Sequence, residues 1–189
     1  MSRLSRLLLS LTLLAAAGLS RASAEDLGLR YTPPSASFVC DLPGADWYAF
    51  EEEEGSGFAT HILGPDNPNG TYRTGIDIRW IEKGQPGWVP VKKYIDDLRR
   101  SDKETGRSAT IVQPYRMSGL LARLFEVVQH RRLPDSQLPS LEEELHDYYA
   151  VVPVGESYYS IKLSSTRDVY LDYRELFVKF LHSFKTLGR

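Results

Sequence analysis

Two imidazoles and a carboxylate could meet beside one predicted hairpin. His130 follows a predicted strand over 120–129, and His146 and Asp147 begin the next strand. The connection between them could bring the three side chains together, and zinc accepts imidazole and carboxylate ligands. Histidines at strand ends are more often unliganded, and the four histidines show no i, i+4 pair typical of a helical metal site. We predict no cofactor, and His130, His146 and Asp147 are the candidates if a metal binds.

The sequence contains no recognisable catalytic motif. It lacks a Gly-x-Ser-x-Gly elbow, a phosphate-binding glycine loop and a cysteine–histidine signature. Cys40 is the only cysteine and lies in an apolar run, which favours a buried thiol, with an intermolecular disulfide as the alternative. The acids Glu51–Glu54 could bind calcium, but neighbouring strand residues point to opposite faces, so a solvated edge or turn is the better interpretation. We therefore expect a protein that is not an enzyme.

Aromatic residues near glycine- and proline-rich segments form a second group of candidates. Tyr72 lies in one such segment, and Trp80 and Trp88 flank the next. Aromatic side chains on loops commonly anchor a partner. Trp80 alternates with Ile76 and Ile78, which indicates a core position instead. Tyr72 and Trp88 are therefore the predicted partner-binding residues.

The strongest local pattern lies near the end of the chain, where a hairpin and a helix are predicted. Two runs, 145–153 and 158–164, alternate apolar and polar residues, as half-buried strands do. A turn containing proline and glycine joins them. Over 169–185 the apolar spacing changes to three and four residues, which predicts an amphipathic helix. The apolar stripe of this helix must be buried, so we expect the helix to pack across a sheet.

The remaining pattern predicts further strands and one more helix. The strands are expected over 36–41, 47–53, 58–63, 75–82, 109–115 and 120–129. The second helix begins at Pro90. The strand 120–129 is apolar on both faces, so it needs cover on both sides. We predict an α+β fold, with a mostly antiparallel central sheet covered by helices on both faces in an α/β/α sandwich.

The first 24 residues have the features of a cleaved signal peptide. Arg3 and Arg6 precede an apolar segment over 7–19, and Ala22-Ser23-Ala24 has the small-x-small form of a signal peptidase site. A membrane anchor is the alternative, but the apolar segment is short for one. We predict a periplasmic or extracellular protein with no membrane span after cleavage.

Beyond the signal peptide, the chain has the length of one domain. Residues 25–35 contain two prolines and no periodicity, which predicts a flexible lead-in, and 36–189 is predicted to be a single domain. The whole chain has 23 Lys and Arg against 25 Asp and Glu, and cleavage would remove three arginines, which leaves a net charge of −5. A mildly acidic domain argues against general nucleic-acid binding.

The order of elements and several short motifs resemble the PsbP-like fold, and within it the bacterial secreted proteins related to DcrB. The resemblance covers about 36–187. Its motifs are FVCDLPGADW at 38–47, YIDDL at 94–98, SGLLARLF at 118–125, YSIKL at 159–163 and FLHSFK at 180–185. Members of this fold include a photosystem II extrinsic subunit, a Ran-binding import factor and periplasmic proteins, and no shared catalytic motif is known among them. The resemblance therefore implies a non-catalytic role and assigns no site residue.

These features lead to one expected function and one alternative. We expect a non-catalytic secreted or periplasmic binding or accessory protein that acts through loop surfaces over 64–75, 83–89 and 131–144. Its partner would be an envelope protein or a small ligand. The alternative is a carrier of a small hydrophobic ligand or lipid, with a pocket between the sheet and the C-terminal helix.

The predicted leader can be tested directly on protein isolated after export. We expect N-terminal sequencing of the mature chain to begin at Glu25, because cleavage is predicted after Ala24. A mature protein that retains Arg3 and Arg6 would contradict the cleavage and favour the membrane anchor.

Overall fold

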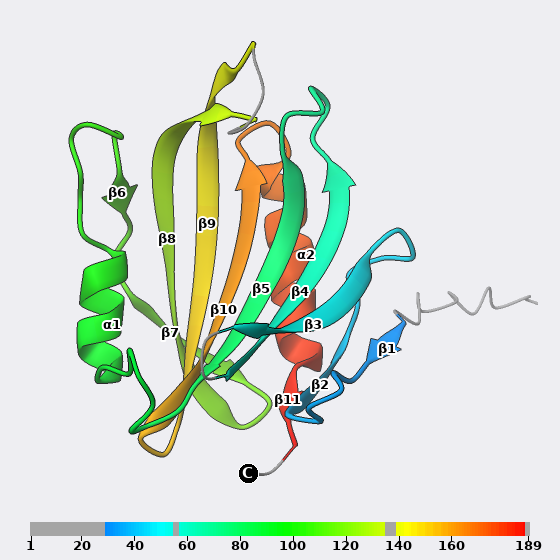
Figure 1. Ribbon diagram of the computed structural model, residues 1–189, viewed down its shortest axis with the longest axis vertical. Coiled ribbons are helices and arrows are strands. Elements are labelled where there is room, and N and C mark those ends of the chain that lie inside the picture. The colour runs from blue at the N-terminus through cyan, green and yellow to red at the C-terminus, as the bar shows by residue number, and fades with distance from the viewer. Residues whose placement is uncertain (1–28, 55–56, 135–138, 188–189) are drawn as a thin grey trace, which may run out of the picture.

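The computed structural model describes residues 29–54, 57–134 and 139–187 (Figure 1). The predicted signal peptide lies outside the described residues. The strands are β1 Arg30–Tyr31, β2 Phe38–Asp41, β3 Tyr48–Glu54, β4 Gly57–Asp66, β5 Arg73–Ile81, β6 Ser108–Ala109, β7 Gln113–Met117, β8 Leu120–Leu133, β9 Leu141–Val154, β10 Ser157–Thr166 and β11 Lys185–Thr186. The helices are α1 Val91–Leu98 and α2 Tyr170–Ser183.

An eight-stranded antiparallel sheet forms the body of the protein (Figure 1). Its order is β3-β4-β5-β10-β9-β8-β6, and β7 also pairs with β8. The predicted C-terminal hairpin is present as β9 and β10 in the middle of this sheet. A smaller three-stranded sheet, β1-β2-β11, joins early and late segments of the chain. Its strand β1 belongs to the predicted lead-in.

The first face of the large sheet carries the main core. The stripe of α2 packs against apolar side chains that alternate along the central strands. We call this group the first core, and its sheet and helix members include Ile62, Ile76, Ile78, Ile161, Leu163, Phe177, Phe180 and Leu181. Burying each such side chain contributes about 1.5–3 kcal/mol, so this face supplies most of the hydrophobic stabilisation.

The second face has a smaller apolar group at one end. Ile95 of α1 packs there against residues of β8, β9 and β10. We call this group the second core, and its buried members are Ile95, Phe125, Val127, Tyr149, Val151 and Tyr158. Elsewhere this face carries the polar residues Asp77 of β5, Asp147 of β9 and Lys162 of β10.

The predicted α/β/α sandwich is therefore wrong, because helices do not cover both faces. The described fold is mostly β, with 53% strand and 14% helix in two helices. At eight residues α1 is about 12 Å long, much shorter than the fourteen-residue strands β8 and β9. The pattern over 120–129 overestimates the cover because only Phe125 and Val127 face the second core, and the next residue on that face is the polar Gln129.

The strands also extend into segments predicted as loops. β8 continues to Leu133 and pairs with the start of β9, where Arg131 faces Glu143 and Arg132 faces Glu142. β4 and β5 shorten the predicted loop 64–75, since Asp66 pairs with Arg73 beyond a bulge. Cross-strand pairing of opposite charges supports polar strand ends that local composition assigns to loops.

The first core gives a stability prediction. Phe177 is 0% exposed and packs against Tyr148, with 5.5 Å between the ring centroids. We expect Phe177→Ala to lower the free energy of unfolding by about 3–5 kcal/mol, because it leaves a cavity in a well-packed interior. Urea unfolding followed by circular dichroism measures this change.

Phe50→Ala provides the matched control. Phe50 is 40% exposed at the edge of the same sheet, so the same truncation should cost less than about 1 kcal/mol. Equal losses in the two variants would show that α2 does not bury Phe177 as described.

Candidate functional site

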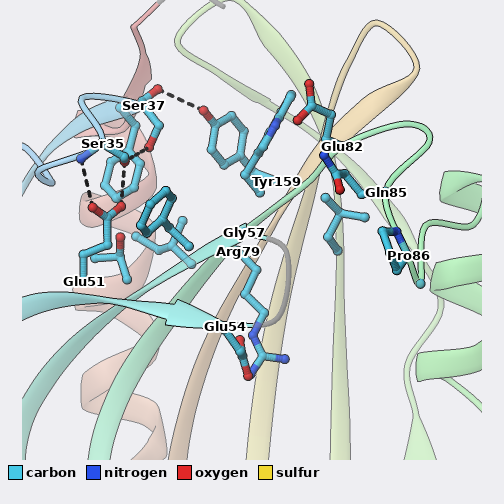
Figure 2. A pocket seen from close by; sticks show the side chains of 17 residues that line it. Ser35, Ser37, Glu51, Glu54, Gly57, Arg79, Glu82, Gln85, Pro86 and Tyr159 are labelled. Carbon is cyan, nitrogen blue, oxygen red and sulfur yellow. Dashed lines mark hydrogen bonds and ion pairs between the residues drawn. The ribbon is translucent and has the colours of Figure 1, made fainter.

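A cavity of about 330 Å³ opens at the start of β4 and the end of β5, and we call it the Trp80 cavity (Figure 2). Residues 35–38 and Glu51 form one side, and residues 82–87 form the other. In Figure 2 Ser35, Ser37 and Glu51 lie across the opening from Glu82, Gln85 and Pro86. This volume lies in the range of small-molecule sites, about 300–1,000 Å³.

Alternation along two paired strands positions the aromatic wall of this cavity. Trp80 of β5 and Tyr159 of β10 are register partners on the first face, with 4.6 Å between their ring centroids. The Tyr159 hydroxyl donates to the carbonyl oxygen of Ser37 at 2.9 Å, which fixes the ring against the 35–38 segment. Trp80 packs against the first core, as its spacing predicts. Phe58, in the next strand, adds an aromatic side chain that is 45% exposed.

The polar lining of the Trp80 cavity is acidic. Ser35 donates to Glu51 from its backbone N–H at 2.9 Å and from its hydroxyl at 2.6 Å. Arg79, the only basic lining residue, pairs with Glu54 at 2.9 Å. Within the described ranges no hydrogen bond or ion pair reaches the carboxylate of Glu82. The buried Nε1 of Trp80 has no hydrogen-bond partner there either. The cavity thus combines aromatic walls with net negative charge.

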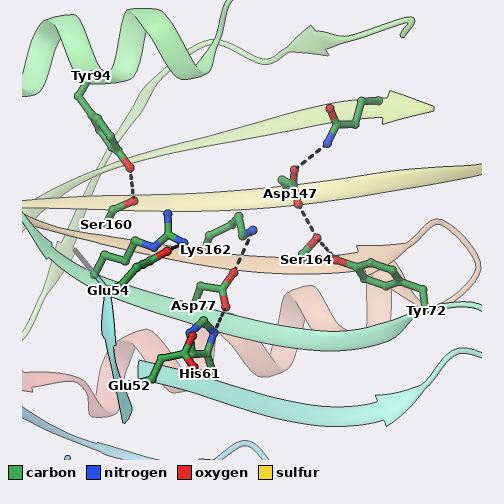
Figure 3. Close-up of polar contacts among 12 residues, drawn as sticks. Glu52, Glu54, His61, Tyr72, Asp77, Tyr94, Asp147, Ser160, Lys162 and Ser164 are labelled. Atoms are coloured by element: carbon green, nitrogen blue, oxygen red, sulfur yellow. Dashed lines mark hydrogen bonds and ion pairs between the residues drawn. The ribbon is translucent and has the colours of Figure 1, made fainter. Parts of the chain in front are cut away.

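A second polar group crosses the uncovered part of the second face, and we call it the open face (Figure 3). Glu52, His61, Asp77 and Lys162 come from the four adjacent strands β3, β4, β5 and β10. The Glu52 carboxylate lies 3.1 Å from His61 Nε2, His61 Nδ1 lies 2.8 Å from Asp77, and Lys162 Nζ lies 2.9 Å from Asp77. Each member is therefore held by a neighbour across the sheet.

Charge pairing favours the charged forms of Asp77 and Lys162 on the open face. Burial favours neutral Asp77, but the adjacent Lys162 and His61 outweigh it and lower the pKa of the carboxyl. Burial likewise opposes the charge on Lys162, but Asp77 and Asp147 outweigh it and raise the pKa of the ammonium. Lys162 is thus a fixed cation at neutral pH, which does not suit it to the role of general base or nucleophile.

Tyr72 and Trp88, the predicted partner-binding residues, both have contacts within the chain. The Tyr72 hydroxyl donates to Ser164 at 2.7 Å, and Ser164 donates to Asp147 at 2.5 Å (Figure 3). Trp88 packs on the second core and donates from Nε1 to the carbonyl oxygen of Glu156 at 3.2 Å. These contacts hold both rings in place, and their binding role stays a prediction.

The residues predicted as possible metal ligands are divided between the two faces. Asp147 lies on the second face, where Ser164 and Gln129 donate to it. His146, its neighbour in β9, points to the first face and stacks on Tyr170 with 4.3 Å between ring centroids. His130 shares the face of His146, since strand residues two apart point the same way and Val128 pairs with His146. The described part of the chain contains no group of three or more His, Cys, Asp or Glu suited to a metal ion.

His146 instead belongs to an ionic cluster near the start of α2. Its Nδ1 lies 2.5 Å from Glu126 and its Nε2 lies 2.9 Å from Glu144. Burial opposes the charged imidazole, but the hydrogen bonds and charges of Glu126 and Glu144 outweigh burial and raise the pKa of His146. Arg167 and His130 approach Glu144 at 3.7 and 3.8 Å. The cluster joins β8, β9 and the start of α2.

Cys40 occupies a core position on β2. Its side chain is 1% exposed, and burial raises the pKa of the thiol to about 12. The thiol is therefore protonated and shielded at neutral pH, which matches the interpretation as a buried residue rather than a reactive one.

Comparison with known proteins gives a likeness in fold. No protein-family model and no curated protein matches the chain. A solved structure from Bacteroides thetaiotaomicron is similar at 10% identity and a TM-score of 0.50, over 86% of this chain and 50% of that one. This chain thus spans half the length of that protein. The solution structure of cyanobacterial PsbP from Synechocystis sp. PCC 6803 is similar at 12% identity and a TM-score of 0.47, over 90% of this chain and 99% of that one. One of these two neighbours is a PsbP protein, and both likenesses concern the fold alone.

The ionic cluster around His146 predicts a pH dependence of stability. Because folding raises the pKa of His146 above its ordinary value of 6.5, its contribution is fully present below about pH 6.5 and is lost as the pH rises through the folded-state value. We expect the melting temperature of the wild type to fall over this alkaline limb, and that of His146→Asn to fall less. Thermal melts across the pH range measure both slopes.

His182→Asn is the control for this measurement. His182 is exposed in the last turn of α2 and lies away from the cluster of Glu126 and Glu144, so its replacement should preserve the wild-type slope. A slope that flattens equally in both variants would contradict the special role of His146.

Proposed function

We propose that the chain is a non-catalytic binding protein, exported to the periplasm or secreted, that takes a small ligand or a side chain of an envelope partner in the Trp80 cavity. The observation that carries this proposal is the cavity of about 330 Å³, walled by Trp80, Tyr159 and Phe58. One side of the cavity is the 82–87 segment, which belongs to the loop surface expected to act in binding. Export is proposed from the leader sequence alone.

The lining indicates the chemistry of the bound group. Glu51, Glu54 and Glu82 line the cavity, and Arg79 offsets a single negative charge through its pair with Glu54. Aromatic faces attract cations electrostatically, and carboxylates strengthen the same preference. A group with an aromatic or aliphatic body and a positively charged amine suits these walls better than a neutral or anionic group of the same size.

A second candidate function is the carriage of a small hydrophobic ligand beside the C-terminal helix. The interface between the sheet and α2 is filled by Phe177 and Leu181, which are fully buried. A separate cavity of about 260 Å³ lies where α2 meets the 41–45 segment, lined in part by Leu42, Leu176 and Phe180. This cavity favours a ligand at the side of the helix rather than beneath it.

The Trp80 cavity can be tested with three probes that share a phenylethyl or phenylmethyl body: 2-phenylethylamine, 2-phenylethanol and phenylacetate. We expect the amine to bind most tightly and phenylacetate least, because the lining is acidic. Phe58→Ala should weaken amine binding by roughly tenfold through the loss of an aromatic wall. Isothermal titration calorimetry measures the affinities.

Two matched variants provide the controls. Phe50→Ala removes an aromatic side chain of similar exposure outside the cavity and should leave amine affinity unchanged. Glu82→Gln should reduce the preference for amine over alcohol, whereas Glu53→Gln, which alters an exposed acid outside the lining, should not. Absence of binding by all three probes, or equal losses in the Phe58 and Phe50 variants, would refute the proposed site.

A further inference from the structure

A separate cleft of about 380 Å³ lies between α1 and β8 on the second face, and we call it the α1 cleft. Figure 1 shows α1 at the β8 end of the sheet. Val91 and Ile95 of α1 and Val112 before β7 form apolar walls, and Lys92 and Asp96 lie on α1 beside them. Arg123 of β8 completes the lining.

Arg123 is unusual because one nitrogen of its guanidinium is buried without a partner among the described residues. It pairs through the backbone with Val151 and Pro114 and faces the same side as Phe125. Its Nη1 is buried, and the described residues offer it no hydrogen-bond acceptor. A guanidinium does not lose its proton in proteins, so burial cannot be relieved by neutralisation. Arg123 as a whole is half-buried, but a charged group with a buried nitrogen that lacks a partner among the described residues favours an anion beside it in the cleft.

The acid nearest in the lining does not fill that role. Asp96 pairs with Lys92 at 2.7 Å, four residues apart on the outer side of α1. Asp96 and Lys92 in the cleft therefore form an ion pair with each other, and neither of them pairs with Arg123. The positive charge of Arg123 therefore favours an anion from outside the chain.

We propose that the α1 cleft binds a small carboxylate with an aliphatic chain. The guanidinium of Arg123 pairs with the carboxylate, for which its parallel N–H groups are well suited. The chain lies against Val91, Ile95 and Val112. This site is independent of the Trp80 cavity, with the opposite charge and on the other face of the sheet, and it does not rest on the function proposed above.

Octanoate, octanol and octylamine test this site, since they share a chain and differ in the head group. Titrations of the ¹⁵N-labelled protein followed by amide NMR shifts report both affinity and location. We expect octanoate to bind most tightly and to shift the amides of Ile95, Val112 and Arg123. Arg123→Met should weaken octanoate binding by roughly tenfold or more through the loss of a charged hydrogen bond, and leave octanol binding unchanged.

Arg132→Met is the control, because it removes an exposed arginine from the same strand outside the cleft and should keep wild-type affinity for octanoate. If Arg123→Met does not fold, Arg123→Lys addresses the same point: it keeps the charge but loses the parallel N–H pair, and should weaken octanoate without affecting octanol. Octanol binding as tightly as octanoate, unchanged octanoate affinity in the Arg123 variants, or octanoate shifts confined to the Trp80 cavity would each overturn the proposal.

Discussion

The register of β10 is the constraint on which the rest of the structure depends. This strand pairs with β9 over ten residue pairs and with β5 over seven, so it lies at the centre of the sheet. Its odd-numbered residues Tyr159, Ile161 and Leu163 enter the first core, while Lys162 lies in the polar network of the open face. A slip of one residue would exchange the two sets and drive an ammonium into an apolar interior. Each face therefore fixes the register for the other.

The two faces of the large sheet are stabilised in different ways. On the first face α2 supplies apolar cover, and on the second face charge pairs across the sheet replace cover where α1 ends. Both proposed sites lie where apolar cover gives way to polar surroundings, the Trp80 cavity beyond the first core and the α1 cleft beside the second. Such borders leave concave spaces in which aromatic or aliphatic walls meet a few charged groups, as small-molecule sites require.

Local periodicity predicted the strands and helices well, but it did not predict which residues from distant segments lie together. Alternation identified the β9–β10 hairpin, the helix α2 and the inward position of Trp80, because each depends on residues two to four apart. It could not show which of the neighbours His146 and Asp147 lies under α2 on the first face and which lies on the second face, since this depends on where α2 packs. The Trp80 cavity joins segments around 35, 58, 80 and 159, and no local pattern connects them. In the sequence Arg123 resembles any polar strand residue, because only the assembled fold shows that its Nη1 lacks a partner among the described residues.

The small sheet of β1, β2 and β11 links distant parts of the chain at the wall of the Trp80 cavity. The carbonyl oxygen of Ser37 accepts hydrogen bonds from the Tyr159 hydroxyl, 122 residues away, and from the backbone N–H of Leu187. Strand β11 also pairs directly with β2. A chain that emerges from the ribosome N-terminus first can form β3–β5 early, but this wall is complete only after the residues of β11 have been synthesised. A ligand at the proposed site would therefore stabilise the finished protein without rescuing a partial chain, because the cavity wall forms only when the fold is complete.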